Sequence, residues 1–138
     1  MSAAKKSDVE VLSGKVFTLR WRKGWYWHLD IHPYQQTAVH DVIAITEAVR
    51  SFHEGKTPAK SPLLIHRGFA SSPQLDALLH YSKAAAELAS AIAYVVSSVD
   101  AEDSSALVQR WFLRELPVRI FHKEKEAVAW LEQFAAAP

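Results

Sequence analysis

The sequence predicts an α/β (α+β) fold in which a mixed β-sheet has helices packed on it. The prediction rests on a change in the spacing of apolar residues. From residue 15 to residue 32 apolar and polar side chains alternate, which is typical of strands, and from residue 37 apolar residues recur at helical spacing. Beyond residue 60, short apolar runs and helical stretches follow one another, as they do in the strand–helix units of a parallel sheet.

Three strands are predicted at the start of the chain. Residues 9–12 form a short strand, and residues 15–21 and 25–32 form a hairpin whose turn contains Gly24, where a positive φ is expected. Pro33 ends the hairpin because proline has no N–H to donate to a strand ladder. One face of the hairpin is apolar and comprises Phe17, Leu19, Trp21, Trp25, Trp27, Leu29 and Ile31.

Four helices and three further strands follow in alternation. The helices span residues 37–53, 72–89, 100–114 and 123–134, and the strands between them span residues 63–65, 91–96 and 118–121. Thr37 is the expected N-cap of the first helix, and Ser72 caps the second, with Pro73 at its first position. The order is therefore β-β-β-α-β-α-β-α-β-α, and right-handed crossovers place the last three strands parallel in one sheet.

Composition limits the classes of protein that the chain can represent. Its 138 residues have a formal net charge of +1 and no cysteine. The missing cysteines exclude disulfides, thiolate catalysis and cysteine-based metal sites, and the balanced charge gives no reason to expect nucleic acid as a partner.

The distribution of apolar residues along the chain also indicates its domain organisation and location. No apolar run approaches the roughly 20 residues of a membrane span, and no export signal is visible, so we expect a cytoplasmic protein without a membrane span. We expect one domain over residues 8–134, between a disordered tail of residues 1–7 and a short tail of residues 135–138.

Three stretches of sequence, together with the order of elements, carry a family resemblance. They are residues 64–69 (LIHRGF), the segments WFL and LPVRIF within residues 111–121, and residues 126–131 (EAVAWL). They resemble a divergent bacterial branch of the STAS domains, the anti-anti-sigma-factor-like fold, sometimes grouped with CRAL-TRIO-type lipid-binding domains. The resemblance covers residues 8–134. It implies a non-enzymatic regulatory module that acts through protein–protein interaction, and we expect an unknown protein partner or a homodimer.

The resemblance also implies a candidate phosphorylation site. In phospho-switched STAS domains, a serine in an Asp-Ser-(Ser/Thr)-Gly turn at the start of the second helix is modified. The matching stretch here is Ala-Ser-Ser-Pro-Gln, so Ser71 and Ser72 are retained but the acid and the glycine are absent. Arg67 is placed to pair with a phosphate at a helix N-terminus, whereas the alternative is that Ser72 is simply a helix cap.

A second functional hypothesis is a small anionic or lipid-like ligand bound at the carboxyl ends of the parallel strands. Ligands commonly bind there in open sheets. The residues expected at this edge are His66, Arg67, Ser71, Ser72, Ser97, Ser98 and His122. Hydroxyls, histidines and a cation beside helix starts suit an anion, although serine and histidine also end strands and cap helices for structural reasons alone.

His28, Asp30 and His32 alternate on one predicted strand and form a weak candidate for a metal site. Side chains two residues apart on a strand diverge by ~7 Å, so we expect a hydrated polar face and no metal or other cofactor. An enzyme that uses these three residues, or His66 with His122, is the least favoured hypothesis, because the sequence contains no catalytic signature. The sequence therefore favours an interaction module first, with its surface at the loop and helix start of residues 67–74, and a ligand-binding protein second.

Overall fold

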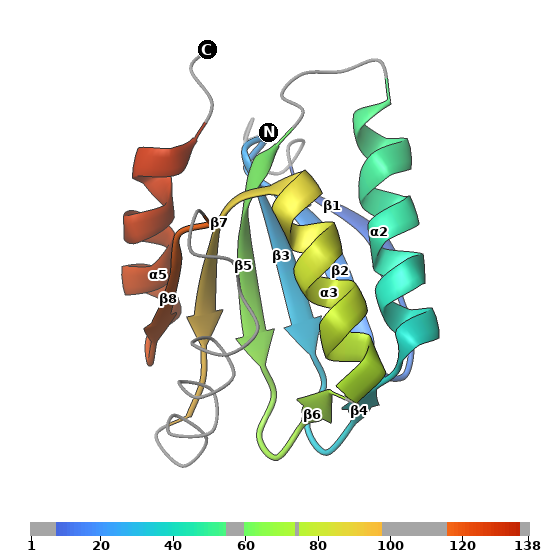
Figure 1. Cartoon of the computed structure of the whole chain (residues 1–138). Coiled ribbons are helices and arrows are strands. Elements are labelled where there is room, and N and C mark those ends of the chain that lie inside the picture. The colour runs from blue at the N-terminus through green and yellow to red at the C-terminus, as the bar shows by residue number, and fades with distance from the viewer. Residues whose placement is uncertain (1–7, 55–59, 74, 98–115, 136–138) are drawn as a thin grey trace.

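The computed structural model describes residues 8–54, 60–73, 75–97 and 116–135, and it confirms the predicted mixed α/β fold. Within these residues a six-stranded sheet has the order β1-β2-β3-β5-β7-β8, and two very short strands, β4 and β6, form a separate pair (Figure 1). Each strand of the main sheet therefore lies beside the strands that come before and after it in the chain.

The first three strands form the antiparallel part of the sheet, as the alternating pattern predicts. They are β1 (Val9–Ser13), β2 (Phe17–Arg22) and β3 (Tyr26–Ile31), and β2 pairs with β3 from Phe17 opposite Ile31 to Arg22 opposite Tyr26. The turn between them contains two residues with positive φ, Lys23 at 53° and Gly24 at 76°.

The remaining strands are parallel to β3. They are β5 (Ser61–Arg67), β7 (Ala89–Val95) and β8 (Val118–Phe121), which pair in that order beside β3. Because β3, β5, β7 and β8 run in the same direction, their carboxyl ends lie at one edge of the sheet, which we call the carboxyl edge. It is the lower edge in Figure 1.

Helices pack on both faces of the sheet. Helices α2 (Val39–His53) and α3 (Leu75–Leu88) lie side by side on one face (Figure 1), and their core with the sheet includes Phe17, Leu19, Trp21, Trp27, Leu29, Ile31, Ile45, Val49, Ile65, Ala85 and Ile92. Helix α5 (Glu124–Leu131) and the short helix η1 (Glu132–Phe134) pack on the opposite face, where Tyr26, Leu64, Ala91, Ala93, Val95, Ala127 and Leu131 are buried. None of the helices in the described ranges combines the length and hydropathy needed to cross a bilayer.

Both predicted helix caps are wrong. Thr37 lies in β4 (Gln36–Thr37) and Ser72 lies in β6 (Ser72–Pro73), and these two strands pair in parallel. The N-cap of α2 is Ala38, whose N–H donates to the Asp41 carboxylate at 2.8 Å. Thr37 and Ser72 do not cap the helices because each lies in a short strand, and these two strands pair with each other. The helix predicted at residues 100–114 lies outside the described residues.

The predicted apolar and polar faces of the hairpin are also only partly correct. Trp25 lies in the turn and packs against the opposite face from Trp27. Its ring contacts Tyr26 there, with centroids 4.6 Å apart. His28 was expected on a hydrated face, but His28 and its neighbour Tyr26 are both buried on the side of the sheet that α5 covers. The alternation of the two faces is therefore as predicted, but the face that carries the polar residues is covered by α5 and is more buried than those residues suggest.

Gly68, directly after β5, allows the carboxyl ends of β3 and β5 to approach closely. Its N–H donates to the Ile31 carbonyl at 2.7 Å. A Cβ added at this position would lie 2.3 Å from that carbonyl oxygen and 2.6 Å from the nitrogen of Pro33. Both neighbours are backbone atoms, so the clash could be relieved only by separating the two strand ends.

We predict that Gly68→Ala lowers the free energy of unfolding by about 3 kcal/mol, because backbone must move to admit the methyl group. Urea denaturation followed by circular dichroism measures the loss. The matched control is Gly14→Ala, because a Cβ at Gly14 meets nothing within 4 Å and should leave stability nearly unchanged. Equal midpoints for both variants would contradict this role of Gly68.

Candidate functional site

Two loops at the carboxyl edge are joined into one unit. Residues 32–35 connect β3 to β4, and residues 68–71 connect β5 to β6. The Tyr34 N–H donates to the Phe69 carbonyl at 2.9 Å, and the Ser72 N–H donates to the Gln35 carbonyl at 3.1 Å. The pairing of β4 with β6 continues this contact. We call residues 32–37 and 67–73 the carboxyl-edge platform.

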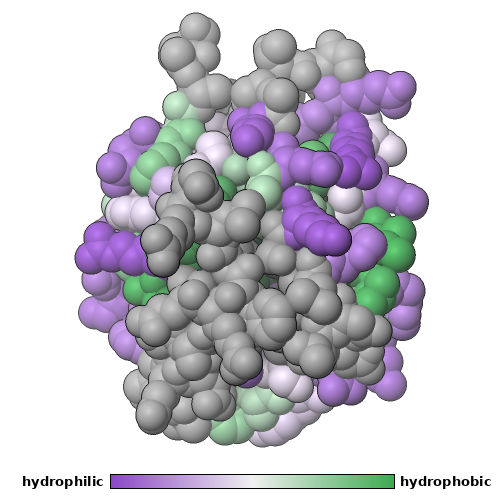
Figure 2. All heavy atoms as spheres, in the orientation of Figure 1, coloured by the Kyte–Doolittle hydropathy of each residue, from purple (hydrophilic) through white to green (hydrophobic). Residues whose placement is uncertain are grey.

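The platform presents two aromatic side chains to solvent. Tyr34 is 73% exposed and Phe69 is 46% exposed. Their rings meet edge to face, with centroids 5.7 Å apart and an interplanar angle of 80°. In Figure 2, pale green and white residues gather at the lower end of the molecule, where these loops lie in Figure 1. A contacting pair of large exposed aromatics at the edge of a sheet is typical of a binding surface.

The backbone of the platform is strained at two positions. Tyr34 has a φ of 62° and Ala70 a φ of 57°, in the left-handed region that residues other than glycine seldom adopt. Each such residue costs about 1–2 kcal/mol, and the strain persists only where surrounding contacts hold the backbone in place. Strained residues of this kind concentrate at binding sites, where they fix the direction of neighbouring side chains.

Arg67 holds the second loop of the platform closed. Its guanidinium donates through both Nε, at 3.0 Å, and Nη2 to the carbonyl of Ser71. The Ser71 hydroxyl is buried and donates to the Gly68 carbonyl at 2.8 Å. Ser72, by contrast, is exposed. Of the two predicted phosphorylation sites, Ser72 is therefore the one that solvent and a kinase can reach in this conformation.

A partly buried tyrosine, Tyr94, lies within reach of the charge of Arg67. Tyr94 on β7 is opposite Ile65 of β5, and burial raises the pKa of its phenol, which the charge of Arg67 opposes only in part. Tyr94 is therefore neutral at physiological pH and serves as an uncharged support on the face that α2 and α3 cover.

The other residues predicted at the carboxyl edge do not converge on one point. His66 and Arg67 are successive on a strand and so face opposite sides of the sheet. His66 Nδ1 lies 3.2 Å from the Asp30 carboxylate, and His122 donates through Nδ1 to the Val96 carbonyl at 3.0 Å. Ser97 follows β7 half-buried, and Ser98 lies outside the described residues.

The three side chains of the weak metal candidate, His28, Asp30 and His32, each have a different partner. His32 donates through Nδ1 to the Lys15 carbonyl at 2.8 Å, so its Nε2 accepts from the Thr18 hydroxyl at 2.9 Å. Asp30 lies against His66, and His28 Nδ1 lies 3.1 Å from Arg22. Among the described residues, no three histidine or acidic side chains are arranged to hold a metal ion.

Sequence reasoning missed Tyr34, and it did not single out Phe69, although Phe69 lies in the segment of residues 67–74 that was favoured as the interaction surface. Neither belongs to a periodic stretch, and each matters only because two loops that are far apart in the chain lie side by side. The available signal was their position beside Pro33 and Gly68, residues that end strands and fix tight loops.

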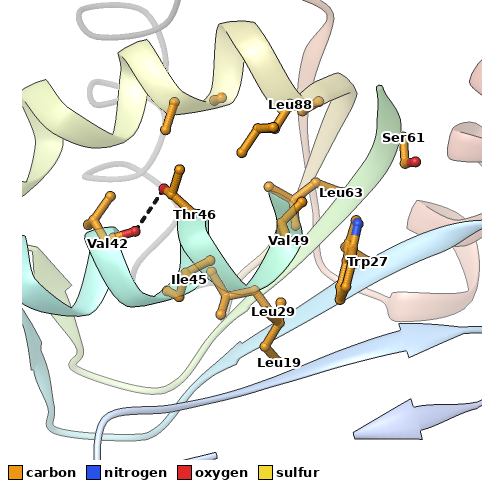
Figure 3. Close-up of a pocket in the computed structure, with 13 residues that line it drawn as sticks. Leu19, Trp27, Leu29, Val42, Ile45, Thr46, Val49, Ser61, Leu63 and Leu88 are labelled. Carbon is orange, nitrogen blue, oxygen red and sulfur yellow. Dashed lines mark hydrogen bonds between the residues drawn. The ribbon is translucent and has the colours of Figure 1, made fainter. Parts of the chain in front are cut away.

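A separate apolar cavity of about 50 Å³ lies between the sheet and the helix pair α2 and α3 (Figure 3). It is lined by Leu19, Trp27, Leu29, Val42, Ile45, Thr46, Val49, Ser61, Leu63, Ala84, Ala85, Leu88 and Ala89. The Thr46 hydroxyl donates to the Val42 carbonyl, whereas the buried Ser61 hydroxyl has no hydrogen-bond partner within the part of the chain that the structure describes. Ser61 is the first residue of β5, so the cavity reaches toward the amino end of that strand, away from the carboxyl edge.

Comparisons with known proteins support the fold. A family model described as "Domain of unknown function (DUF7793)" matches residues 27–135. The crystal structure of an uncharacterized protein of the DUF3478 family, with a SpoIIAA-like fold, from Shewanella loihica PV-4 is similar with a TM-score of 0.60 and 15% identity. The similarity covers 87% of this chain and 98% of that one, and it confirms the predicted STAS-like, that is SpoIIAA-like, fold. No curated protein matches the chain.

We predict that Arg67→Lys loosens the platform without unfolding the protein, because lysine cannot reproduce the two-point contact with Ser71. Amide hydrogen exchange of Tyr34 and Ser72 should accelerate about tenfold, the equivalent of about 1.4 kcal/mol. Arg119→Lys is the matched control, since Arg119 is exposed and lies over the Phe121 ring away from the platform. Unchanged exchange at both amides in Arg67→Lys would show that Arg67 does not hold the loop.

Proposed function

The chain belongs to the DUF7793 family, and we propose that it is a non-enzymatic regulatory module that binds another protein through the carboxyl-edge platform. The observation that carries this proposal is the exposed pair of Tyr34 and Phe69 on a backbone that is held on both sides. Aromatic side chains are enriched among the residues that dominate binding energy at protein interfaces. Because the loops are already ordered, binding through them costs little conformational entropy.

The STAS-like fold supports the same location. The resemblance to STAS domains implies that the segment before the second helix meets the partner, and this segment forms half of the platform. Ser72 lies exposed within it, three residues after Phe69. Phosphorylation of Ser72 would add close to two negative charges beside the aromatic pair, which would weaken an apolar interface there.

The partner can be a different protein or a second copy of the chain. We propose a different protein in the cytoplasm, because the platform is small and two aromatic anchors suit a transient regulatory contact. A homodimer through the same platform is the other possible outcome, and the experiment below separates the two.

A photo-reactive side chain in place of Phe69 tests the proposal in cells that make the protein. We predict a cross-linked adduct from this position and none from the same group in place of Ile43, an exposed apolar residue on α2. Tyr34→Ser should reduce the adduct at least about tenfold, as expected when a residue worth about 1.4 kcal/mol or more is removed from an interface.

The mass of the adduct distinguishes the outcomes. An adduct with a second protein supports the proposed function, whereas an adduct of two copies replaces it with a homodimer interface. Equal labelling from positions 69 and 43 would contradict any specific role of the platform.

A second candidate function is binding of an apolar ligand in the cavity between α2, α3 and the sheet. It is favoured by the buried hydroxyl of Ser61, which has no partner among the described residues and borders a mostly apolar lining. A buried hydroxyl without a partner costs about 1–3 kcal/mol, so a ligand with a polar end would offset a cost that the empty protein bears. A cavity of about 50 Å³ admits only a few atoms, such as the end of an acyl chain, unless α2 and α3 separate.

We predict that Ser61→Ala raises the free energy of unfolding by about 1 kcal/mol in the ligand-free protein, because it removes an unpaired hydroxyl. The control is Thr46→Val, which should change the free energy of unfolding in the opposite direction. The Thr46 hydroxyl donates to the Val42 carbonyl, so its loss should lower stability. Urea denaturation of both variants gives the comparison. A loss of stability in Ser61→Ala would remove the reason to expect a polar ligand group there.

A further inference from the structure

A row of four polar side chains crosses the sheet on the face that α5 covers. It starts at Asp8, passes through Arg22 on β2 and His28 on β3, and ends at Glu124, the first residue of α5. The Asp8 carboxylate lies 3.6 Å from Arg22 Nε, Arg22 Nη1 lies 3.1 Å from His28 Nδ1, and His28 Nε2 lies 3.6 Å from the Glu124 carboxylate. The platform and the apolar cavity use none of these residues.

The tautomer of His28 follows from its contact with Arg22. A guanidinium can only donate hydrogen bonds, so His28 Nδ1 must accept and the ring proton lies on Nε2. His28 is only 6% exposed, and its buried Nε2 has no hydrogen-bond partner among the described residues. The Glu124 carboxylate, 3.6 Å away, lies just beyond hydrogen-bond distance. The neutral ring is therefore held on one side only.

We propose that His28 is a proton-operated switch that pairs with Arg22 when neutral and with Glu124 when protonated. A proton taken from solvent binds Nδ1, which then becomes a donor and can no longer accept from Arg22. The imidazolium repels the guanidinium, and its Nε2–H attracts the Glu124 carboxylate, which needs to move by less than about 1 Å to form a hydrogen bond.

The first turn of α5 is the element that such a switch would move. No side chain caps this helix at Lys123, and Glu124 and Glu126 lie in its first turn. The helix is anchored further along by the buried Ala127 and Leu131. A stronger bond from Glu124 to the sheet would therefore fix the first turn of α5, while Arg22, released from His28, would keep Asp8 as its partner in the row.

Charged groups on the neighbouring strands and on α5 act on His28: Arg22 on β2, Asp30 on β3, His66 on β5 and Glu124 on α5. Arg20 lies opposite His28 on β2, and Tyr26 lies two residues before it on β3. Burial lowers the pKa of His28 below its ordinary value of 6.5, Arg22 and His66 lower it further, and Glu124 and Asp30 oppose the shift. Burial also raises the pKa of Tyr26, which stays neutral.

The sign of the pH effect on stability follows from this shift. Below pH 6.5 the unfolded chain binds a proton at His28 more readily than the folded chain does. The stabilisation from neutral His28 is therefore complete above pH 6.5 and is lost as the pH falls from 6.5 toward the lower folded pKa. The switch thus operates in mildly acidic solution.

Nitrogen NMR of the His28 imidazole in the full chain, followed over pH, tests the proposal. We expect the Nε2–H tautomer at neutral pH and a titration midpoint below 6.5. Glu124→Gln should move the midpoint to lower pH and Arg22→Gln to higher pH, because each removes one of the two competing charges. Glu126→Gln, which changes an exposed acid in the same helical turn, should leave it unchanged.

A second readout separates a switch from a passive buried histidine. The amide shifts of residues 124–127 should change with the same midpoint as the His28 ring, and Glu124→Gln should abolish this change. A midpoint that is insensitive to Glu124→Gln, or α5 amides that do not follow His28, would overturn the proposal. Glu124 is half exposed, so Glu124→Gln tests the idea without endangering the fold.

Discussion

The close backbone approach between Gly68 and Ile31 is the constraint on which the carboxyl edge depends. The 2.7 Å hydrogen bond joins the ends of β3 and β5 at a distance that no side chain would allow. The loops that follow are then near enough to bond to each other and to continue into the paired strands β4 and β6. Without this contact, Tyr34 and Phe69 would lie on two independent loops, and ordering both of them would weaken any partner's binding.

The two faces of the sheet differ in polarity. The face under α2 and α3 is mainly apolar, whereas the face under α5 also carries charged side chains. The face under α2 and α3 is packed with aliphatic and aromatic side chains, and the apolar cavity there is bordered by one hydroxyl that has no partner among the described residues. The face under α5 combines a smaller apolar cluster with charged side chains that cross β2 and β3. The carboxyl edge lies between these faces, so a partner at the platform need not compete with either feature.

Much of the fold could be predicted from spacing alone, because long strands and helices repeat their pattern several times. The hairpin of β2 and β3 and the parallel strands were found in this way, and the resemblance to STAS domains rested on their order together with three stretches of sequence. Strands of two residues have no period to detect, so β4 and β6 were missed and Thr37 and Ser72 were mistaken for caps. Tyr34, Phe69 and the burial of His28 depend on contacts between distant segments, which no local pattern contains.

We expect the carboxyl-edge platform to behave as one rigid unit that holds its aromatic pair in a fixed position. Nitrogen-15 relaxation of the backbone amides in the full chain tests this claim directly and needs no partner. Order parameters of about 0.85 at Tyr34, Phe69 and Ala70, equal to those of β3, are the expected result. Values below about 0.6 at these residues, with rigid strands on either side, would show two flexible loops and contradict the claim.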